Sequence, residues 1–337
     1  MPKILLPTIE PANSRGGIAR YLAAIKATFS DDVELINVQP SYLTIFQKVF
    51  WQPRKTIGMT WINHPLPIGT VAWLWSLVSR HPYTIFLHGL DFDLARRNAW
   101  KRWLSKQILN RAKHIVTNTR ALAQEVHDFA PTSTQPLIVY PVVSDELLAA
   151  ASESFTRHGE QPLTLLTVSR LVERKGHIKV LDALLELDDI KYVIVGSGPE
   201  QETIERAIEQ RNLSHRVQLL DDADDQKLVE AYRQADIFVM PTSKTPTDRE
   251  GFGIVYLEAQ LFGLPVIATN HPGVDEAVNE NVTGLLIDDS HPALVAALRK
   301  LISDATLRSR LGNGGPDWVR KNFVREVQMK KLTACLI

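Results

Sequence analysis

The sequence has 337 residues, of which 45% are hydrophobic, and its 38 Lys and Arg balance 38 Asp and Glu. This composition is typical of a globular protein, and a chain of this length forms one or two domains, more often two. Its one cysteine, Cys335, excludes an internal disulfide and a cysteine metal cluster and fits a reducing compartment, so we expect a cytoplasmic protein. Met1 to Pro7 lack the layout of a signal peptide, and no apolar run approaches the roughly 18 residues of a membrane-spanning helix.

The charges are divided unevenly between the two halves. Residues 1–150 hold 16 Lys and Arg against 10 Asp and Glu, a net charge of +6, and residues 151–337 hold the remaining 22 against 28, a net charge of −6. Such asymmetry is expected if the first half meets an anionic surface, and chance explains it equally well.

The first half alternates short apolar runs with helical patterns. A strand over 3–6 and a polar loop precede Gly16, Gly17 and a helical run over 18–29. Further strands are predicted over residues 33–38, 59–62, 83–87, 114–118 and 137–140. Strands that alternate with helices favour a parallel sheet.

The second half repeats this alternation more regularly. Strands are predicted over residues 163–169, 191–195, 216–220, 236–240, 264–268 and 283–287, with helices between them, for example over 200–211 and 227–234. The strandless polar stretch 151–161 is interpreted as a linker. We therefore expect an N-terminal domain over 1–155, a C-terminal domain over 156–320, and a last helix over 316–337 that packs back towards the N-terminal domain.

Ligands of an open parallel sheet bind beyond the carboxyl ends of its strands. Four loops of the second half follow such ends, and they carry, in turn, Arg170 and Lys175, Gly196 and Gly198, the approach to Glu250, and Asn270 to Gly273. We expect these loops to converge on one rim.

The most informative segment is Glu250-Gly-Phe-Gly-Ile-Val-Tyr-Leu-Glu258. Phe252 and Gly253 precede an apolar run that begins at Ile254, and this pattern predicts the N-terminus of a helix. The free backbone N–H groups of a helix N-terminus suit a phosphate. The carboxylates of Glu250 and Glu258, on either side, suit the hydroxyls of a ligand. Glu258, about two turns into this helix, needs a partner, because an unpaired buried carboxylate costs several kcal/mol or shifts its pKa. Ribose hydroxyls or a structural ion pair would supply one.

Other candidate residues are less specific. Arg170 and Lys175 could clamp a diphosphate or could be two solvated cations. The turn of Gly196 and Gly198 lacks the dinucleotide fingerprint and brings backbone close to a ligand or to a facing loop.

The first half supplies two candidates. Gly17 opens a helix whose N-terminus either accepts a ligand or is a plain turn. His88 follows the predicted strand 83–87, and we expect it to face the ligand rather than to serve a structural role.

Together these residues resemble the retaining glycosyltransferases of family 4, and the resemblance spans nearly the whole chain. The segments that fit, in order, are Ser169 to Gly176, Val195 to Glu200, Glu250 to Glu258, Gly263 to Ala268 and Pro272 to Glu276, with Gly16, Gly17, His88 and Gly89 in the first half. Pro272 replaces the first glycine of the family's Gly-Gly-hydrophobic-x-Glu segment. The resemblance implies the α/β GT-B fold, in which two Rossmann-like domains with parallel sheets face each other across a cleft.

The resemblance also implies the activity. A hexosyltransferase of polysaccharide or lipopolysaccharide synthesis would move a sugar from a UDP- or GDP-sugar to a glycan or lipid-linked acceptor, with retention of anomeric configuration, no bound metal and no further cofactor. The implied catalytic residues are His88, Arg170, Lys175 and Glu250. The implied donor-binding residues are Gly17, Gly196, Gly198, Phe252, Gly253, Ile254 and Glu258.

Among these, Arg170 and Lys175 would hold the diphosphate and Glu258 the ribose, while His88 would contact the transferred sugar from the opposite domain. Asp91-Phe-Asp93, which has the letters of a metal motif but follows His88, is interpreted as polar and cleft-facing.

Residues 96–113 carry seven basic residues and no acid, with Trp100, Trp103, Leu104 and Ile108 on one predicted face. This composition is typical of an interfacial helix that would attach the protein to anionic lipid on the inner face of a membrane. An ordinary helix that packs its Trp stripe on the sheet explains it equally well.

An epimerase-type or non-catalytic GT-B protein that binds a nucleotide sugar is the alternative to a transferase. The intact His88, Arg170, Lys175 and glutamate pair favour an active enzyme. A phosphorylase would need a far longer chain and a pyridoxal-binding lysine. The basic residues accompany no base-reading motif, which argues against a nucleic-acid partner.

Overall fold

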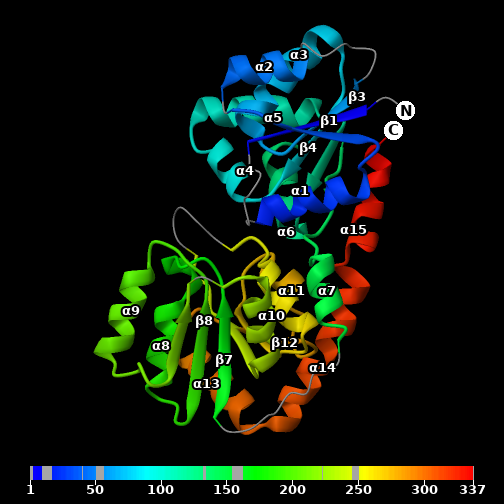
Figure 1. The fold of residues 1–337 in the computed structure, drawn as a ribbon. Coiled ribbons are helices and arrows are strands. Elements are labelled where there is room, and N and C mark those ends of the chain that lie inside the picture. Colours follow the sequence, from blue (N-terminus) through cyan, green and yellow to red (C-terminus); the bar gives the residue numbers. More distant parts are fainter. Residues whose placement is uncertain are drawn as a thin grey trace. The chain divides into compact units, whose positions relative to one another are not determined.

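The chain forms two α/β units (Figure 1), and the structure, a computed structural model, describes residues 3–9, 17–39, 41–50, 57–131, 134–153, 162–221, 223–244 and 250–336. Unit 1 comprises Met1–Ser144 and Val324–Ile337, and unit 2 comprises Asp145–Phe323. The first division lies before the helix α7 (Asp145–Ala150), upstream of the expected division at 155. Gly16 and most of the expected linker, residues 154–161, lie outside the described residues.

Unit 1 is built on a parallel sheet with the strand order β2-β1-β3-β4-β5-β6. The strands are β1 (Lys3–Thr8), β2 (Val33–Asn37), β3 (Ile57–Ile62), β4 (Tyr83–Leu87), β5 (His114–Thr117) and β6 (Leu137–Ile138). The six strands predicted for the first half are confirmed. Their ends differ from the prediction by no more than two residues.

Helices cover both faces of this sheet. They are α1 (Gly17–Thr28), α2 (Tyr42–Phe50), α3 (Thr70–Ser79), α4 (Leu90–Ala95), α5 (Ala99–Arg111), α6 (Arg120–Phe129) and α15 (Arg325–Leu332), with short turns η1 (Pro65–Gly69) and η3 (Thr333–Cys335). Along β4, Ile85 joins a core with α2, α3, α5 and α6, whereas the next residue, Phe86, joins a core with α1 and α15. Because successive side chains of a strand point to opposite faces, both faces of β4 are buried.

Unit 2 repeats this architecture with the strand order β12-β11-β10-β7-β8-β9, again all parallel. The strands are β7 (Leu163–Val168), β8 (Ile190–Val195), β9 (Val217–Leu220), β10 (Ile237–Met240), β11 (Val266–Thr269) and β12 (Gly284–Ile287). The helices are α7, α8 (His177–Leu184), α9 (Gln201–Gln210), α10 (Asp225–Gln234), α11 (Ile254–Leu261), α12 (Val274–Ala277), α13 (His291–Ser303) and α14 (Ala305–Asn322), with a short turn η2 (Glu173–Lys175). The predicted strands of the second half are confirmed.

The prediction of one helix over 316–337 is wrong. Pro316 lies inside α14, which ends at Asn322, and the chain then passes through Phe323 and an extended Val324 before α15 begins. Phe323 is buried, with its ring 5.7 Å from that of Trp318. The residues after Phe323 belong to unit 1, where α15 packs on α1.

The expectation that residues 96–113 place Trp and aliphatic residues on one helical face is also wrong. Leu104 and Ile108 of α5 are buried, but Trp100 and Trp103 are 55% and 59% exposed. The buried face of α5 is formed by Leu104, Ser105, Ile108 and Leu109. At 3.6 residues per turn Trp103 lies about 140° around the helix from Ile108, and Trp100 lies in the first turn, before the buried residues begin. Among the described residues, none of the helices has the length and apolar character needed to cross a bilayer.

Glycines hold α14 close to α11 in unit 2. A Cβ on Gly315 would lie 2.3 Å from the carbonyl oxygen of Gln260 in α11, and one on Gly312 would lie 2.3 Å from that of Gly263. Such distances are well inside van der Waals contact, so only glycine allows the two backbones to approach this closely.

We predict that Gly315→Ala lowers the free energy of unfolding by about 1–3 kcal/mol, because the added methyl forces α14 away from α11. Asn313→Ala is the matched control, since Asn313 is exposed on the same helix and alanine raises helix propensity by a few tenths of a kcal/mol. Urea unfolding followed by circular dichroism measures both. Equal stability of the two variants would contradict the close packing.

Candidate functional site

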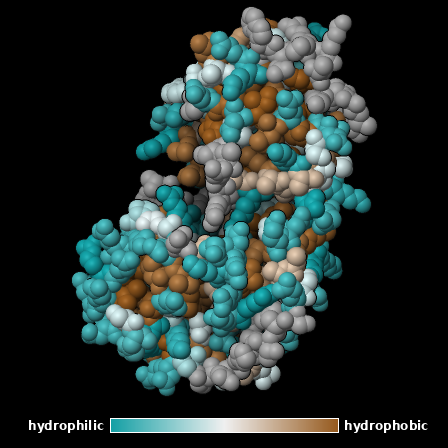
Figure 2. Space-filling model, viewed as in Figure 1, coloured by the Kyte–Doolittle hydropathy of each residue, from teal (hydrophilic) through white to brown (hydrophobic). Residues whose placement is uncertain are grey.

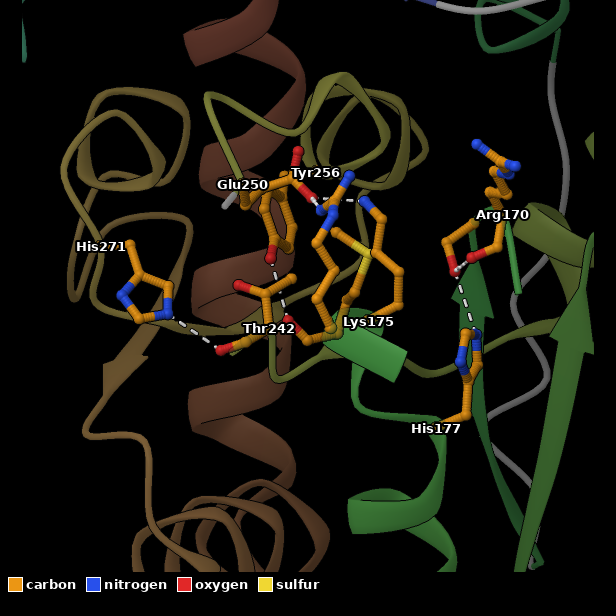
Figure 3. Close-up of polar contacts among 10 residues, drawn as sticks. Arg170, Lys175, His177, Thr242, Glu250, Tyr256 and His271 are labelled. Atoms are coloured by element: carbon orange, nitrogen blue, oxygen red, sulfur yellow. Dashed lines mark hydrogen bonds and ion pairs between the residues drawn. The ribbon is translucent and has the colours of Figure 1, made fainter. Parts of the chain in front are cut away.

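Two loops of unit 2 meet beyond the carboxyl ends of β7 and β10, where three charged residues form one cluster (Figure 3). The carboxylate of Glu250 accepts a hydrogen bond from Arg174 Nη1 at 2.7 Å and another from Lys175 Nζ. Arg174 and Lys175 belong to η2. All three side chains are largely buried, with 9% of Lys175, 10% of Glu250 and 18% of Arg174 exposed.

The cluster keeps Glu250 ionised. Burial by itself would raise the pKa of this carboxyl, but Lys175 and Arg174 outweigh the burial and hold the pKa below its ordinary value of 4.5. Two cations and one carboxylate leave a net charge of 2 − 1 = +1. The cluster therefore favours an anionic ligand.

Arg170 lies apart from this cluster (Figure 3). Arg170 follows Ser169 just after the end of β7, and it is exposed. Within the described parts of the chain, its side chain makes no hydrogen bond or ion pair. The cation that accompanies Lys175 in the cluster is Arg174, which directly precedes it in the sequence and was not among the predicted site residues. Arg170 remains available to a ligand.

The four loops expected on one rim are in contact with one another. Gly196 and Gly198 pack on the first loop, the backbone N–H of Ser243 donates to the carbonyl oxygen of Arg174 at 2.8 Å, and His271 Nε2 donates to the carbonyl oxygen of Thr242 at 2.9 Å. The loops after β7, β8, β10 and β11 thus form a continuous rim, as predicted.

Gly196 and Gly198 allow the loop after β8 to pack closely against the backbone of the loop after β7. Gly196 has a φ of +141°, and a Cβ there would lie 1.9 Å from the carbonyl oxygen of Ser169. A Cβ on Gly198 would lie 2.4 Å from that of Leu171. The two glycines therefore fix the backbone on both sides of Arg170, while their contact with a donor stays a prediction.

The helix N-terminus predicted in the glutamate segment is confirmed. α11 begins at Ile254, directly after Gly253, whose φ of +80° suits glycine. A Cβ on Gly253 would meet the ring of Tyr256, whose hydroxyl donates to the carbonyl oxygen of Met240 at 2.9 Å. Phe252 is buried, with its ring 5.7 Å from that of Phe323. Packing on both sides therefore fixes the start of α11.

Glu258 lies little more than one turn into α11, rather than two. It is fully buried and accepts a hydrogen bond from the hydroxyl of Tyr232 at 2.8 Å. The Tyr232 ring stacks on Phe262, with centroids 5.3 Å apart. A neutral hydroxyl on α10, which no local sequence signal announces, is thus one partner of this carboxylate.

His88 lies in unit 1, directly after β4, as predicted. Burial, with a smaller contribution from His64, lowers its pKa to about 3, so the imidazole is neutral. Its Nε2 is buried and has no hydrogen-bond partner within the described residues, and the ring of Tyr21 lies edge-on at 5.3 Å. Its backbone N–H donates to Asp91 Oδ1 at 2.9 Å.

Gly17, Asp91 and Asp93 are the other residues of unit 1 that the sequence singled out. Gly17 is the first residue of α1, and a Cβ there would meet nothing within 4 Å. Burial raises the pKa of Asp91 to about 7, and Asp93 pairs with Arg96. No three His, Cys, Asp or Glu side chains of the described residues are placed to hold a metal ion.

Comparison with known proteins identifies two family models along the chain. The model described as glycosyl transferases group 1 matches residues 151–318, and the model described as glycosyltransferase family 4 matches residues 50–146.

Two relatives illustrate the sequence similarity. A GDP-mannose-dependent alpha-(1-6)-phosphatidylinositol monomannoside mannosyltransferase of Mycobacterium tuberculosis is 37% identical over 183 residues, which are 52% of this chain and 47% of that protein. A D-inositol 3-phosphate glycosyltransferase of Corynebacterium glutamicum is 30% identical over 280 residues, 75% of this chain and 66% of that protein. The chain thus spans about half the length of the mannosyltransferase that it matches.

Solved structures share the fold. A sucrose-phosphate synthase from Thermosynechococcus elongatus superposes with a TM-score of 0.81 at 20% identity, covering 100% of this chain and 99% of that chain. HepE of Anabaena, in complex with UDP-glucose, superposes with a TM-score of 0.76 at 18% identity, covering 99% of each chain. With two parallel six-stranded sheets, two matching family models and these neighbours, the chain belongs to the family 4 (group 1) glycosyltransferases and has the GT-B fold.

Proposed function

We propose that the protein is a hexosyltransferase that moves a sugar from a UDP- or GDP-sugar to a glycan or lipid-linked acceptor, with retention of anomeric configuration and without a bound metal. The observation that carries this proposal is the buried cluster of Lys175, Glu250 and Arg174 on the rim that also bears the N-terminus of α11. Relatives named for GDP-mannose and a neighbour bound to UDP-glucose support a nucleotide-sugar donor.

The cluster suits the diphosphate of such a donor. Its net positive charge, the free guanidinium of Arg170 on the same loop and the backbone N–H groups at the start of α11 are all groups that bind phosphate oxygens. Glu250 holds Lys175 and Arg174 in place before the ligand arrives. Their side-chain entropy is therefore already lost when the diphosphate binds, which favours affinity.

The same groups favour the chemical step. The bond between the anomeric carbon and the phosphate oxygen breaks, its electron pair stays on the oxygen, and the sugar becomes oxocarbenium-like. Lys175 and Arg170 stabilise the charge that grows on this oxygen more than they stabilise the intact donor. The acceptor hydroxyl attacks the same face of the sugar, and its proton passes to the departing phosphate.

We assign the remaining predicted residues to the donor. His88 contacts the transferred sugar, because a neutral imidazole with an unpaired Nε2 can hydrogen-bond a sugar hydroxyl. Glu258 binds the ribose, Glu250 with the backbone of Phe252, Gly253 and Ile254 holds sugar and phosphates, and Gly17, Gly196 and Gly198 let backbone approach the ligand. A lipid-linked acceptor places the reaction at the inner face of a membrane, to which residues 96–113 would attach the protein.

Calorimetric titration with a panel of nucleotide sugars, followed by turnover with lipid and glycan acceptors, tests the proposal. We expect one UDP- or GDP-sugar to bind and to be consumed only with an acceptor, and NMR of the product to show the anomeric configuration of the donor. Interconversion of the donor without any acceptor would instead indicate an epimerase.

Lys175→Ala should abolish most of the activity. Removing one cation that stabilises the leaving group costs on the order of 3 kcal/mol, which lowers turnover at least about a hundredfold. Binding of the nucleoside diphosphate, measured by calorimetry, should weaken as well. Lys191→Ala is the control, since Lys191 is an exposed lysine of β8. Survival of both binding and transfer in Lys175→Ala would overturn the diphosphate assignment.

Glu250→Gln should lower the thermal stability at about pH 7, because it leaves Lys175 and Arg174 buried without their carboxylate, at a cost of about 3–5 kcal/mol. The folded-state pKa of Glu250 lies below its ordinary 4.5, so the ion pairs stabilise the fold above that pH and are lost as the pH falls through the folded-state value. The difference in melting temperature from wild type should therefore shrink in acid.

Asp289→Asn is the matched control for Glu250→Gln. Its ion pair with Lys179 is more exposed, with 37% and 35% of the two side chains open to solvent, so its loss should cost less than about 1 kcal/mol. A pH-independent difference for Glu250→Gln would contradict the ionised carboxylate.

His88→Ala should lower turnover by about a hundredfold or more and leave the binding of the free nucleoside diphosphate unchanged, because the imidazole is assigned to the sugar alone. With a pKa of about 3, His88 should add no inflection to the pH profile of turnover above about pH 5. His127→Ala, on the exposed face of α6, is the control. An equal loss of diphosphate binding in His88→Ala would contradict the assignment.

A further inference from the structure

Residues 35–124 of unit 1 are almost free of acidic side chains. They hold 12 Lys and Arg against two acids, Asp91 and Asp93. Asp93 pairs with Arg96, and Asp91 accepts the backbone N–H of His88. Both carboxylates thus already have partners within unit 1, and Arg96 pairs with Glu125 of α6 as well.

The helix α3 is apolar on its outer face as well as on its inner face. Its ten residues include no charged side chain. Val71, Ala72 and Ser76 are buried, whereas Leu74, Leu77 and Val78 are 51%, 49% and 78% exposed. The outward face of a surface helix normally carries polar and charged residues. An apolar outward face indicates that something covers it.

The helix α5 lies beside α3 and adds two exposed tryptophans. The rings of Trp73 in α3 and Trp103 in α5 are edge-to-face at 6.2 Å, and Arg111 Nε donates to Ser76 Oγ at 2.7 Å. Trp100 and Trp103 are more than half exposed. We call Leu74, Leu77, Val78, Trp100 and Trp103 the α3–α5 surface. Figure 2 shows hydrophobic residues at the surface of the part of unit 1 that Figure 1 draws in blue to cyan.

Basic side chains accompany this surface along α5. Arg97, Arg102 and Lys106 are exposed, and Lys101 Nζ lies 5.7 Å from the centre of the Trp100 ring. Arg102 and Lys106 also lie over the ring of Phe129 in α6, at 5.6 Å and 5.2 Å from its centre. Aromatic rings with a polar edge and long basic side chains whose stems lie on apolar surface are the residues that occupy the headgroup level of a bilayer.

We propose that the α3–α5 surface docks on an anionic lipid bilayer, with Leu74, Leu77 and Val78 in the acyl region, Trp100 and Trp103 at the headgroups, and the basic residues of α5 on lipid phosphates. The inference rests on the proposed transfer to a lipid-linked acceptor and names the side chains that bring the enzyme to it. The sequence alone indicates α5 as the apolar contact with lipid. In the proposed arrangement the residues of α3 make that contact, and α5 supplies the tryptophans and the basic residues.

Charge complementarity favours lipid over a second copy of the chain. A two-fold contact through this surface would bring the basic residues of α5 from both copies together, and neither α3 nor α5 carries an acidic residue to balance them. Leu74, Leu77 and Val78 carry no hydrogen-bonding groups, so a fluid acyl layer satisfies them without directional partners.

Flotation of the full chain with phosphatidylcholine vesicles, with and without phosphatidylglycerol, tests the proposal. We expect binding to the anionic vesicles only, and weaker binding as salt rises. Leu74→Gln with Leu77→Gln should reduce binding by at least about tenfold. Arg102→Gln and Lys106→Gln should each reduce it by about fivefold. Trp fluorescence should shift to the blue on binding and be quenched by brominated lipid.

Leu185→Gln is the matched control, because Leu185 is a 58% exposed leucine of unit 2 that should leave vesicle binding unchanged. Equal and weak binding to neutral and anionic vesicles would overturn the proposal, as would full binding by the double leucine variant. A wild-type dimer that the leucine variant converts to a monomer, with vesicle binding unchanged, would assign the surface to a second copy.

These outcomes are separate from those of the proposed function. Binding of UDP and GDP, measured by calorimetry without lipid, should be the same in wild type and in the Leu74→Gln, Leu77→Gln variant. Vesicle binding without nucleotide binding would leave the docking surface intact and reject the transferase proposal. Nucleotide binding without vesicle binding would reject the docking surface and leave the transferase proposal intact.

Discussion

The carboxylate of Glu250, shared between Lys175 and Arg174, is the interaction on which the candidate site depends. It joins loops 75 residues apart in the sequence and places both cations on the rim of the unit 2 sheet. Burial of three charges is expensive, and such clusters add little to stability compared with an apolar core. The cluster contributes to the site by fixing where the cations lie. Cations that are already oriented and partly desolvated act more strongly on an incoming anion than cations that move freely in water.

Close packing positions the second element of the site, the start of α11. Gly253 turns the chain into the helix, Tyr256 ties the first turn to β10 through the carbonyl oxygen of Met240, and Phe252 packs on Phe323. On the far side, the glycines of α14 allow backbone contact with α11. A helix held from several sides presents its free N–H groups at a defined place, which is the requirement for recognising a phosphate.

Unit 1 contrasts a buried polar residue with an exposed apolar surface. His88 is held neutral by burial at the end of β4, whereas the α3–α5 surface exposes aliphatic and aromatic side chains on helices that cover one face of the same sheet. Each departs from the usual division of polar and apolar residues in globular proteins. Such departures are expected where a ligand or another surface completes the environment, and the remainder of unit 1 follows the ordinary pattern of a doubly covered parallel sheet.

The twelve strands and the helix start at Ile254 followed from the sequence, because a strand buried on both faces is a continuous apolar run and a glycine before such a run marks a turn into a helix. The pairing of Arg174 with Glu250, and of Tyr232 with Glu258, came only from the tertiary structure. So did the outward direction of Trp100 and Trp103. Local periodicity gives the spacing of residues along an element, but the partner of a buried charge and the face turned to the core depend on contacts between segments far apart in the chain.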